Sequence, residues 1–343
     1  MEGIPAHIER ALDAARTAPS HGNAQPWRFA VDGETISFSI DHERDTSPDG
    51  TMARIGIGAA IECACVAAAR MGATVRFQAP SEGALVTLSI TGPKRLPDPD
   101  LARTRRITNR RIYDARPLDD ATLRVLRDAT AARDRAQTQW FGRERVRALG
   151  PLFEQADALF FSISRLRERQ VFGIRFDVKD REEVSYGLSV GSLELSSGER
   201  ATLMGLRKPL DPRVAAGELK KMGARARRLV ESASGVCIIT TVGSDPMADV
   251  DVGRAVQRAW MVLTQRGLAA QPMTTMMSLS IAAADAGADA DPRIGGLLTA
   301  FRGVFPNVPQ DTRIAFLMRF GWAEAPSCRV GRLPLEESLQ RTP

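Results

Sequence analysis

The chain has 343 residues, of which 43% are apolar and 26% are charged, a balance typical of globular proteins and a length that allows two domains. The net charge is +6, but the 47 basic residues are interleaved with 41 acidic ones, so we expect no nucleic-acid partner. No stretch approaches about 18 uninterrupted apolar residues, so we expect no membrane span.

The chain opens with a predicted amphipathic helix at residues 6–16. This stretch lacks the apolar core of a signal peptide, so we expect a cytoplasmic protein. A loop rich in turn-forming residues follows at residues 19–23. Two short strand-like runs, 27–31 and 35–40, flank an Asp-Gly turn and together predict a hairpin.

The first half of the chain continues with a helix and two strands. The helix is predicted at residues 57–70 and is closed by Gly72, and the strands follow at 73–78 and 84–90. Three prolines then mark a linker: Pro93, Pro97 and Pro99. We therefore expect a first half at residues 1–100 and a second half at residues 101–343.

The second half opens with the densest basic run of the chain, at residues 103–111. This run favours a phosphate-bearing ligand, with a solvated turn as the alternative. Residues 186–212 are rich in Gly and Ser without clear periodicity, and we expect them to form a mobile lid. The other predicted elements are helices at 121–133, 146–179 (mostly helical), 214–231 and 250–266, and strands at 236–242 and 313–320.

The sequence gives little support for a metal site or for a catalytic nucleophile. The four cysteines and three histidines lack the spacing of a zinc site, and we interpret the cysteines as small apolar fillers. No serine lies in a nucleophile elbow, which argues against a hydrolase. Residues 54–61 contain two of the three glycines of a dinucleotide-binding motif, but no apolar strand precedes them, so we predict a helix start there instead.

The two halves contain similar stretches. Segments 58–72 and 253–267 both begin and end with glycine, and both are apolar with a helical period. Segments 12–27 and 126–140 each consist of a predicted helix followed by a glutamine and an aromatic residue. The chain therefore looks like two copies of one unit, and chance similarity between alanine-rich helices is the alternative.

Each of the two copies has a sequence feature that the other copy lacks. The turn-forming residues between Pro19 and Pro26 are missing from the matching stretch 131–136 of the second copy. Conversely, the basic opening at residues 105–111 has no equivalent before the first copy. These complementary losses favour one surviving site made jointly by both halves.

Four motifs resemble those of the nitroreductase family. Residues 18–29 resemble its flavin-contacting loop, and residues 106–118 resemble its N-terminal phosphate-binding motif. Residues 253–273 resemble its central helix and the following loop, and residues 329–335 its C-terminal phosphate-binding stretch. The matches span nearly the whole chain, and their order is similar to that in the subfamily whose two halves are fused in tandem.

The resemblance implies a nitroreductase-like α+β fold in which helices surround mixed or antiparallel sheets. Members of the family are normally homodimers with FMN at the dimer seam. The resemblance therefore implies that both halves of this chain form an intramolecular pseudo-dimer around one FMN. We expect such a pseudo-dimer as a monomer, or as a further homodimer.

The resemblance also implies which residues bind FMN. Four positions match the family's phosphate contacts, namely Arg106, Thr108, Arg110 and Arg332, with Arg111 as an alternative to Arg110. Ser20 and Asn23 match positions that approach the phosphate, the ribityl chain and the ring, and a backbone N–H from about Thr275 would face flavin N5. The complete expected set is Pro19, Ser20, Asn23, Gln25, Arg106, Thr108, Arg110, Pro272, Met273, Thr274, Thr275 and Arg332.

The expected function is that of an FMN-dependent oxidoreductase acting on a small electron-poor or conjugated substrate. Because the cofactor carries the chemistry, we expect no catalytic side chain. The electron donor, NADH, NADPH or neither, is left open, as is the direction of electron transfer. The alternative is an FMN-binding protein that sequesters the cofactor with little turnover.

Overall fold

The structure is a computed structural model of the full chain, and it describes residues 3–92, 106–131, 135–178, 183–208 and 212–340. The predicted linker prolines and the basic residues Arg103 and Arg105 lie outside these residues. The chain forms two compact units: unit 1 comprises Met1–Arg106, Ser244–Met261 and Gly331–Pro343, and unit 2 comprises Ile107–Gly243 and Val262–Val330. The units differ from the expected halves because two later segments pack with the first.

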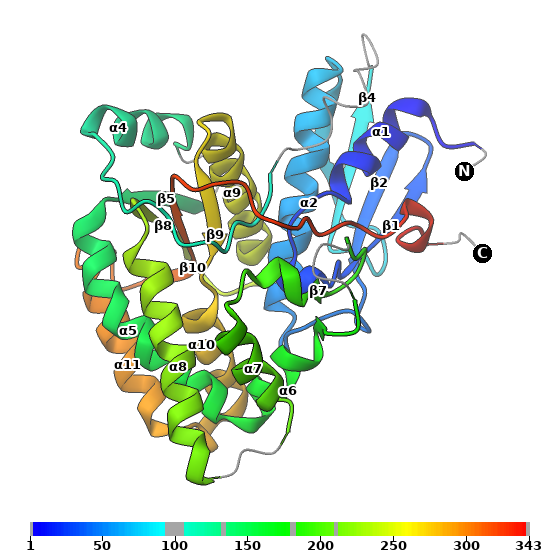
Figure 1. Cartoon of the computed structure of the whole chain (residues 1–343). Coiled ribbons are helices and arrows are strands. Elements are labelled where there is room, and N and C mark those ends of the chain that lie inside the picture. Colours follow the sequence, from blue (N-terminus) through cyan, green and yellow to red (C-terminus); the bar gives the residue numbers. More distant parts are fainter. Residues whose placement is uncertain (1–2, 93–105, 132–134, 179–182, 209–211, 341–343) are drawn as a thin grey trace. The chain divides into compact units, whose positions relative to one another are not determined.

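Unit 1 contains a four-stranded antiparallel sheet in the order β1-β2-β4-β3 (Figure 1). Helix α2 packs against this sheet, and α1 packs against α2. Helix α9 (Pro246–Gln265) contributes its residues up to Met261. The other elements of unit 1 are α1 (Ala6–Ala15), η1 (His21–Asn23), β1 (Trp27–Asp32), β2 (Thr35–Ile40), α2 (Thr51–Arg70), β3 (Thr74–Gln78), β4 (Val86–Thr91) and η4 (Leu335–Glu337).

The predicted hairpin is confirmed. Strand β1 pairs antiparallel with β2 along its whole length, and Gly33 at the turn has φ +54°, a conformation that glycine adopts without strain. Phe29 of β1 and Phe38 of β2 are both fully buried, and their rings meet edge to face with 5.4 Å between centroids. The hairpin therefore supplies the centre of the unit 1 core.

Helix α2 begins at Thr51, earlier than the predicted start at residue 57. The Asp49 carboxylate accepts hydrogen bonds from the backbone N–H and the hydroxyl of Thr51, which orders the helix start. Residues 54–61 lie inside α2, which confirms that they do not form a dinucleotide-binding loop. By length and composition alone α2 is apolar enough to cross a membrane, but 78% of its apolar window is buried, as in a core helix.

Helices α2 and α9 touch backbone to backbone within unit 1. A Cβ atom at Gly58 of α2 would overlap the Val250 carbonyl of α9, and one at Gly253 of α9 would overlap the Ile55 carbonyl of α2. Only glycine fits at these two positions. The glycines that suggested a sequence repeat are thus the residues at which the two helices cross.

Unit 2 contains a second four-stranded antiparallel sheet, in the order β5-β8-β10-β9, and a parallel pair β6-β7. Its helices α5 and α8 form the largest helix–helix contact of the unit (Figure 1). The elements are α4 (Asp120–Ala129), β5 (Ala136–Phe141), α5 (Arg143–Ser162), α6 (Ser164–Phe172), β6 (Ile174–Arg175), β7 (Leu188–Ser189), η2 (Val190–Leu193), α7 (Ser197–Gly205), α8 (Pro212–Glu231), β8 (Gly235–Val242), β9 (Ala269–Pro272), α10 (Thr275–Ala286), η3 (Gly287–Asp289), α11 (Pro292–Gly303) and β10 (Thr312–Gly321).

The two sheets follow the same order of elements along the chain. The first arises from α1-β1-β2-α2-β3-β4 and the second from α4-β5-β8-α9-β9-β10, with additional helices inserted after β5 and after β9. Matching strands occupy matching places in the two sheets, and every pairing is antiparallel. Gly72 after α2 and Gly267 after α9 both have φ +68°, so both helices end in the same way.

One detail of the sequence comparison is wrong. Trp27 is the first residue of β1, whereas Trp140 is near the end of β5, so the two tryptophans are not equivalent in the strands. The predicted helix at 121–133 ends at Ala129, and residues 132–134 lie outside the described part of the chain. The sequence did not predict strand β5, because the polar run Gln137, Thr138 and Gln139 interrupts its apolar alternation.

Residues 186–212, expected to form a lid, contain more regular structure than their composition indicates. They include β7, η2 and the helix α7, and residues 209–211 lie outside the described residues. Ser196 and Glu199 form a capping box at the start of α7, a local signal that starts the helix despite the weak periodicity.

We expect Gly253→Ala to lower the free energy of unfolding by about 1–3 kcal/mol or more, because the new methyl group must push α9 away from the Ile55 carbonyl. The matched control is Gly217→Ala in α8, where no atom lies within 4 Å of the place that the methyl carbon would take and helix propensity favours alanine. Urea unfolding of both variants checks this. Equal stability of Gly253→Ala and the wild type would contradict the close contact.

Candidate functional site

The loop at residues 17–25 of unit 1 holds four of the predicted FMN contacts in a strained conformation. Gly22, Asn23 and Gln25 have φ values of +60°, +55° and +50°, and the left-handed region costs a residue other than glycine about 1–2 kcal/mol. Ser20 Oγ accepts a hydrogen bond of 2.9 Å from the Gln25 backbone N–H, which closes the loop. Since a hydroxyl also carries a donor hydrogen, this bond leaves Ser20 able to donate.

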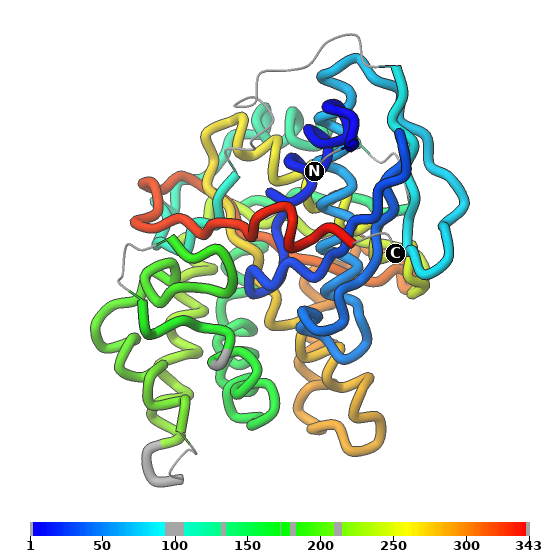
Figure 2. The backbone as a smooth tube through the Cα atoms, turned by 90° about the vertical axis from the view of Figure 1, so that its right-hand side faces the viewer, coloured from blue at the N-terminus to red at the C-terminus, as the bar shows by residue number. Residues whose placement is uncertain are grey.

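Arg332 of the C-terminal segment binds this loop from within the same unit. Its Nε and Nη2 donate to the Ala18 carbonyl at 3.1 and 2.9 Å, and its Nη1 donates to Asn23 Oδ1 at 2.9 Å. The Leu333 backbone N–H donates to Gln25 Oε1 at 2.9 Å. Figure 2 shows the C-terminal segment beside the N-terminal part of the chain. The two residue sets expected from opposite ends of the sequence, around Ser20 and at Arg332, therefore lie together.

Arg106 approaches the same loop. Its Nη2 donates to the Thr17 carbonyl at 3.1 Å, and its guanidinium carbon lies 4.5 Å from the ring centroid of Trp260 in α9. The side chain is buried, its Nε has no hydrogen-bond partner, and among the described residues no carboxylate pairs with it. Burial lowers the pKa of Arg106 to about 10, so the group stays charged at neutral pH.

Such a guanidinium fits an anionic ligand. A buried charge without a counter-ion is costly, and a phosphate that accepts from it removes that cost. The orphaned Nε of Arg106 and the hydroxyl of Ser20 are donors of the kind that a phosphate binds. The residues in unit 1 thus match the chemistry that the phosphate group of FMN requires.

Cys63 of α2 lies next to this cluster, although the sequence suggested for it only the role of a small apolar core residue. Burial raises the pKa of the Cys63 thiol to about 12, although the nearby Arg106 guanidinium lowers it. The thiol is therefore protonated at neutral pH and is no nucleophile. Among the described residues, no three or more His, Cys, Asp and Glu side chains gather where they could hold a metal ion.

Thr108 lies in unit 2, in a segment fixed by β9 and β10. It forms an isolated parallel bridge with Ala270 of β9, and the Asn109 N–H donates to the Ala270 carbonyl at 3.0 Å. The Tyr113 hydroxyl donates to the Asn109 carbonyl at 2.7 Å, which holds the segment in a compact turn. Backbone and side-chain hydrogen bonds therefore order the predicted phosphate motif at Asn109 and Tyr113.

Arg319 of β10 anchors this segment, and the sequence analysis missed it. The side chain is fully buried, donates from Nη2 to the Arg111 carbonyl at 2.6 Å, and stacks on the Tyr113 ring with its guanidinium carbon 3.7 Å from the centroid. Its Nε also donates to Gln271 of β9 at 2.8 Å. An arginine inside a predicted apolar strand is the only signal that the sequence offers for this role.

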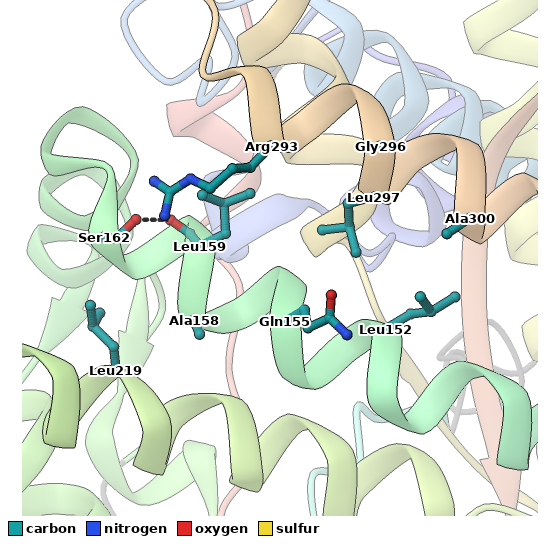
Figure 3. A pocket seen from close by; sticks show the side chains of 10 residues that line it. All are labelled: Leu152, Gln155, Ala158, Leu159, Ser162, Leu219, Arg293, Gly296, Leu297 and Ala300. Carbon is teal, nitrogen blue, oxygen red and sulfur yellow. Dashed lines mark hydrogen bonds between the residues drawn. The ribbon is translucent and has the colours of Figure 1, made fainter.

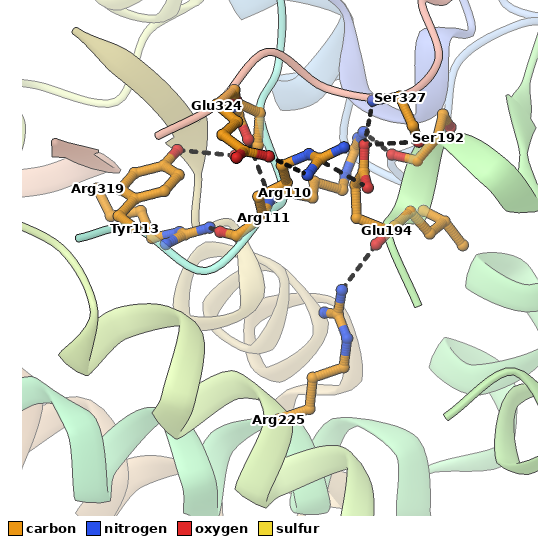
Figure 4. Close-up of polar contacts among 11 residues, drawn as sticks. Arg110, Arg111, Tyr113, Ser192, Glu194, Arg225, Arg319, Glu324 and Ser327 are labelled. Atoms are coloured by element: carbon orange, nitrogen blue, oxygen red, sulfur yellow. Dashed lines mark hydrogen bonds and ion pairs between the residues drawn. The ribbon is translucent and has the colours of Figure 1, made fainter. Parts of the chain in front are cut away.

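The structure distinguishes Arg110 from its neighbour Arg111 (Figure 4). Arg111 pairs with two carboxylates, Glu324 at 3.0 Å and Glu194 at 3.6 Å. Arg110 donates to the Ser192 carbonyl at 3.0 Å and pairs with no carboxylate among the described residues. Burial lowers the pKa of Arg110 to about 10. Arg110 is therefore the better suited of the two to receive an anion.

The predicted residues 272–275 form the junction between β9 and α10. Strand β9 ends at Pro272, the Met273 N–H donates to the Leu317 carbonyl at 2.9 Å, and α10 begins at Thr275. The first N–H groups of a helix have no partner inside the helix. The Thr275 N–H therefore lies at the start of α10, and its role toward flavin N5 stays a prediction.

Asp157 of α5 supports this junction. Its Oδ1 accepts a hydrogen bond of 2.7 Å from the Thr275 hydroxyl. Burial raises the pKa of Asp157 to about 6, while the Thr275 hydroxyl and the Arg225 guanidinium lower it. The carboxyl therefore titrates just below neutral pH.

A groove of about 560 Å³ lies between α5, α8 and α11 of unit 2 (Figure 3). Its lining is mainly apolar, as at Leu152 and Leu297, and none of the predicted site residues contributes to it. Its charged residue Arg293 is neutralised by Asp291, with hydrogen bonds of 2.6 to 3.2 Å. The groove is therefore a mainly apolar hollow without a reactive side chain.

We expect Asp157→Asn to stabilise the protein above pH 6. Because the folded pKa is raised from 3.8 to about 6, the folded state keeps its proton between about pH 4 and pH 6 while the unfolded state releases it. Wild-type stability therefore falls as the pH rises through this interval, and above pH 6 the folded state carries the full cost of the buried charge. Asparagine does not titrate, so the variant should gain about 1–3 kcal/mol at pH 7.5 and little at pH 4.

Urea unfolding at both pH values measures this difference. The control is Asp291→Asn, whose exposed carboxylate has its pKa lowered to about 2 by Arg293, so that this variant should be less stable than the wild type at neutral pH. The same effect of Asp157→Asn at both pH values would contradict the raised pKa.

Comparison with known proteins locates one family signature. The model of the nitroreductase family matches residues 5–37. The chain is also 28% identical over 278 residues to the uncharacterized protein MT1398 of Mycobacterium tuberculosis (strain CDC 1551 / Oshkosh), in an alignment covering 78% of this chain and 38% of that protein. The chain therefore spans well under half the length of this relative.

Solved structures with some similarity include two FMN-dependent nitroreductases named NfnB. The Mycobacterium smegmatis protein, in complex with NADPH, is 16% identical with a TM-score of 0.39, covering 70% of this chain and 96% of its own. The protein from sphigopyxis sp. strain HMH is 20% identical with a TM-score of 0.38, covering 71% and 97%. TM-scores at this level do not establish a shared fold. What the comparisons establish is that residues 5–37, with α1, the 17–25 loop and β1, match the nitroreductase family.

Proposed function

We propose that this chain is an FMN-dependent oxidoreductase of the nitroreductase type and binds one FMN. The observation that carries the proposal is the strained 17–25 loop, which lies within the stretch that matches the family and is bound by Arg332 and Arg106. A loop held in this conformation by two guanidiniums is typical of a binding site rather than of a simple connection.

The phosphate of FMN is the group that we assign to this cluster. A phosphate monoester carries a charge of about −1.5 to −2 at neutral pH and has three acceptor oxygens. Arg106 offers a buried guanidinium without a carboxylate partner among the described residues, and Ser20 offers a hydroxyl donor. Arg332 orders the loop through Ala18 and Asn23 and adds a second positive charge.

The remaining predicted contacts belong to the proposal through the sequence resemblance alone. They are Thr108, Arg110, Pro272, Met273, Thr274 and Thr275. We prefer Arg110 to Arg111 because the carboxylates of Glu194 and Glu324 already neutralise Arg111.

FMN supplies two-electron chemistry at its ring, so the protein's part is to bind, orient and tune the cofactor. The N-terminal turn of α10 offers N–H groups suited to stabilise negative charge on the reduced ring. Asp157 fixes the start of that helix through the Thr275 hydroxyl. We propose NADH or NADPH as the reductant, because nicotinamides deliver hydride to flavins.

We further propose that the chain consists of two fused copies of one ancestral unit. The shared order of elements in the two sheets supports this, as does the α2–α9 contact. Gly58 meets Gly253, a separation of 253 − 58 = 195 residues, and Arg54 pairs with Asp249 at the same separation of 195. Contacts between equal positions of two copies are the signature of a two-fold interface, as in a homodimer.

The direct test is the visible spectrum of the purified full chain and its oxidation of NADH and NADPH with a nitroaromatic or quinone acceptor. A yellow protein with bound FMN that turns over is the expected result. A yellow protein that neither nicotinamide reduces would favour the sequestering function. A colourless protein that takes up no added FMN would contradict both.

We expect Arg332→Ala to weaken FMN binding about ten- to a hundredfold, since it removes a charge-assisted contact and loosens the loop at Asn23. Flavin fluorescence quenching measures the affinity. The matched control is Arg16→Ala, which removes a contact of 3.3 Å to the Leu333 carbonyl of the same C-terminal segment but none to the loop. Equal FMN affinity of Arg332→Ala and Arg16→Ala would exclude Arg332 from the site.

A further inference from the structure

Gln257 of α9 is a fully buried side chain whose amide makes no hydrogen bond to any described residue. Among the described residues neither its Nε2 nor its Oε1 has a partner, and its exposed fraction is 0%. Buried amides in native proteins are nearly always hydrogen-bonded, because leaving donor and acceptor unmade costs the full desolvation free energy of both groups. The two orphaned ends of this amide therefore need a partner from outside the described protein.

The position of Gln257 points to the candidate site. Trp260 follows it by three residues, so the two side chains are neighbours on the surface of α9. Arg106 lies over the Trp260 ring, with its own Nε orphaned. Two buried side chains with unmade hydrogen bonds, Gln257 and Arg106, thus both neighbour Trp260 in unit 1.

The repeat explains why no residue of α2 satisfies the amide. At the separation of 195 residues, Gln257 corresponds to Glu62 of α2 (257 − 195 = 62). Glu62 accepts hydrogen bonds from Arg254 at 3.2 Å and Arg258 at 2.9 Å of α9.

On α2 the residues that correspond to those two arginines are Ala59 and Cys63 (254 − 195 = 59 and 258 − 195 = 63). Neither side chain is a strong donor or acceptor, and the Cys63 thiol stays protonated. One side of the α2–α9 crossing therefore carries a carboxylate neutralised by two arginines. The other side carries a neutral amide and a buried arginine, and no described carboxylate pairs with that arginine.

We propose that Gln257 binds the ribityl-phosphate end of FMN beside Arg106, an inference that rests on the proposed function. An amide offers both donor and acceptor, whereas a phosphate only accepts. A hydroxyl both donates and accepts, so the ribityl hydroxyls together with the phosphate monoester satisfy both ends of the amide.

The test is Gln257→Met in the full chain after removal of bound flavin. Methionine has a similar shape and needs no hydrogen-bond partner, so the melting temperature of the flavin-free protein should rise by about 2–5 °C. The same variant should bind FMN about tenfold more weakly, as fluorescence quenching reports. The control is Gln271→Met, which removes the acceptor of Arg319 and should lower the melting temperature.

An unchanged or lower melting temperature of Gln257→Met would mean that the free protein already satisfies the amide, and the inference would fail. A higher melting temperature with unchanged FMN affinity would also overturn it. If the wild type itself binds no FMN, the proposed function fails and this inference fails with it. FMN binding by the wild type with unchanged affinity in Gln257→Met overturns the inference alone.

Discussion

The close approach of α2 and α9 is the contact on which unit 1 depends. Because Gly58 and Gly253 have no side chains, the two helix backbones meet directly, and this draws a segment from the later part of the chain into the first unit. The same approach puts Arg54 against Asp249 at 2.8 Å and Glu62 between Arg254 and Arg258. These ion pairs are partly buried, so they favour one alignment of the helices over others rather than adding much stability.

Each unit has a buried guanidinium beside its predicted site residues, and these two arginines differ from those of the helix crossing. Arg106 and Arg319 are buried and bind backbone carbonyls and aromatic rings. Burial lowers the pKa of both to about 10, which leaves them charged at neutral pH. Arg319 uses its donors inside the protein, at Leu229, Ser232, Gln271 and Arg111, and so acts on structure. Arg106 keeps an unmade donor, which is why we assign it to a ligand.

Local signals in the sequence were sufficient for much of the fold. The Asp-Gly turn identified the β1–β2 hairpin, and the glycines at 72 and 267 marked the ends of α2 and α9. Long-range pairing was not accessible in this way. Two glycines in apolar helices indicate close packing but not the partner, so the inclusion of Ser244–Met261 in unit 1 could not be predicted. The helices α10 and α11 were also missed, because their alanine- and glycine-containing sequences lack a distinct polar face.

In the candidate site, too, the sequence predicted the residue types but not the conformation that distant contacts impose on them. The residue types in the 17–25 loop were recognisable, but the left-handed backbone of Gln25 has no sequence signal, since glutamine does not favour that region. It is held there because its side chain accepts from the Leu333 N–H and its backbone N–H donates to Ser20. The loop thus owes its shape to a segment more than 300 residues away, since Leu333 lies 308 positions after Gln25. A loop ordered by Arg332 and Leu333 takes this shape only when their segment has docked, so the residues around Ser20 adopt this arrangement only in the folded unit.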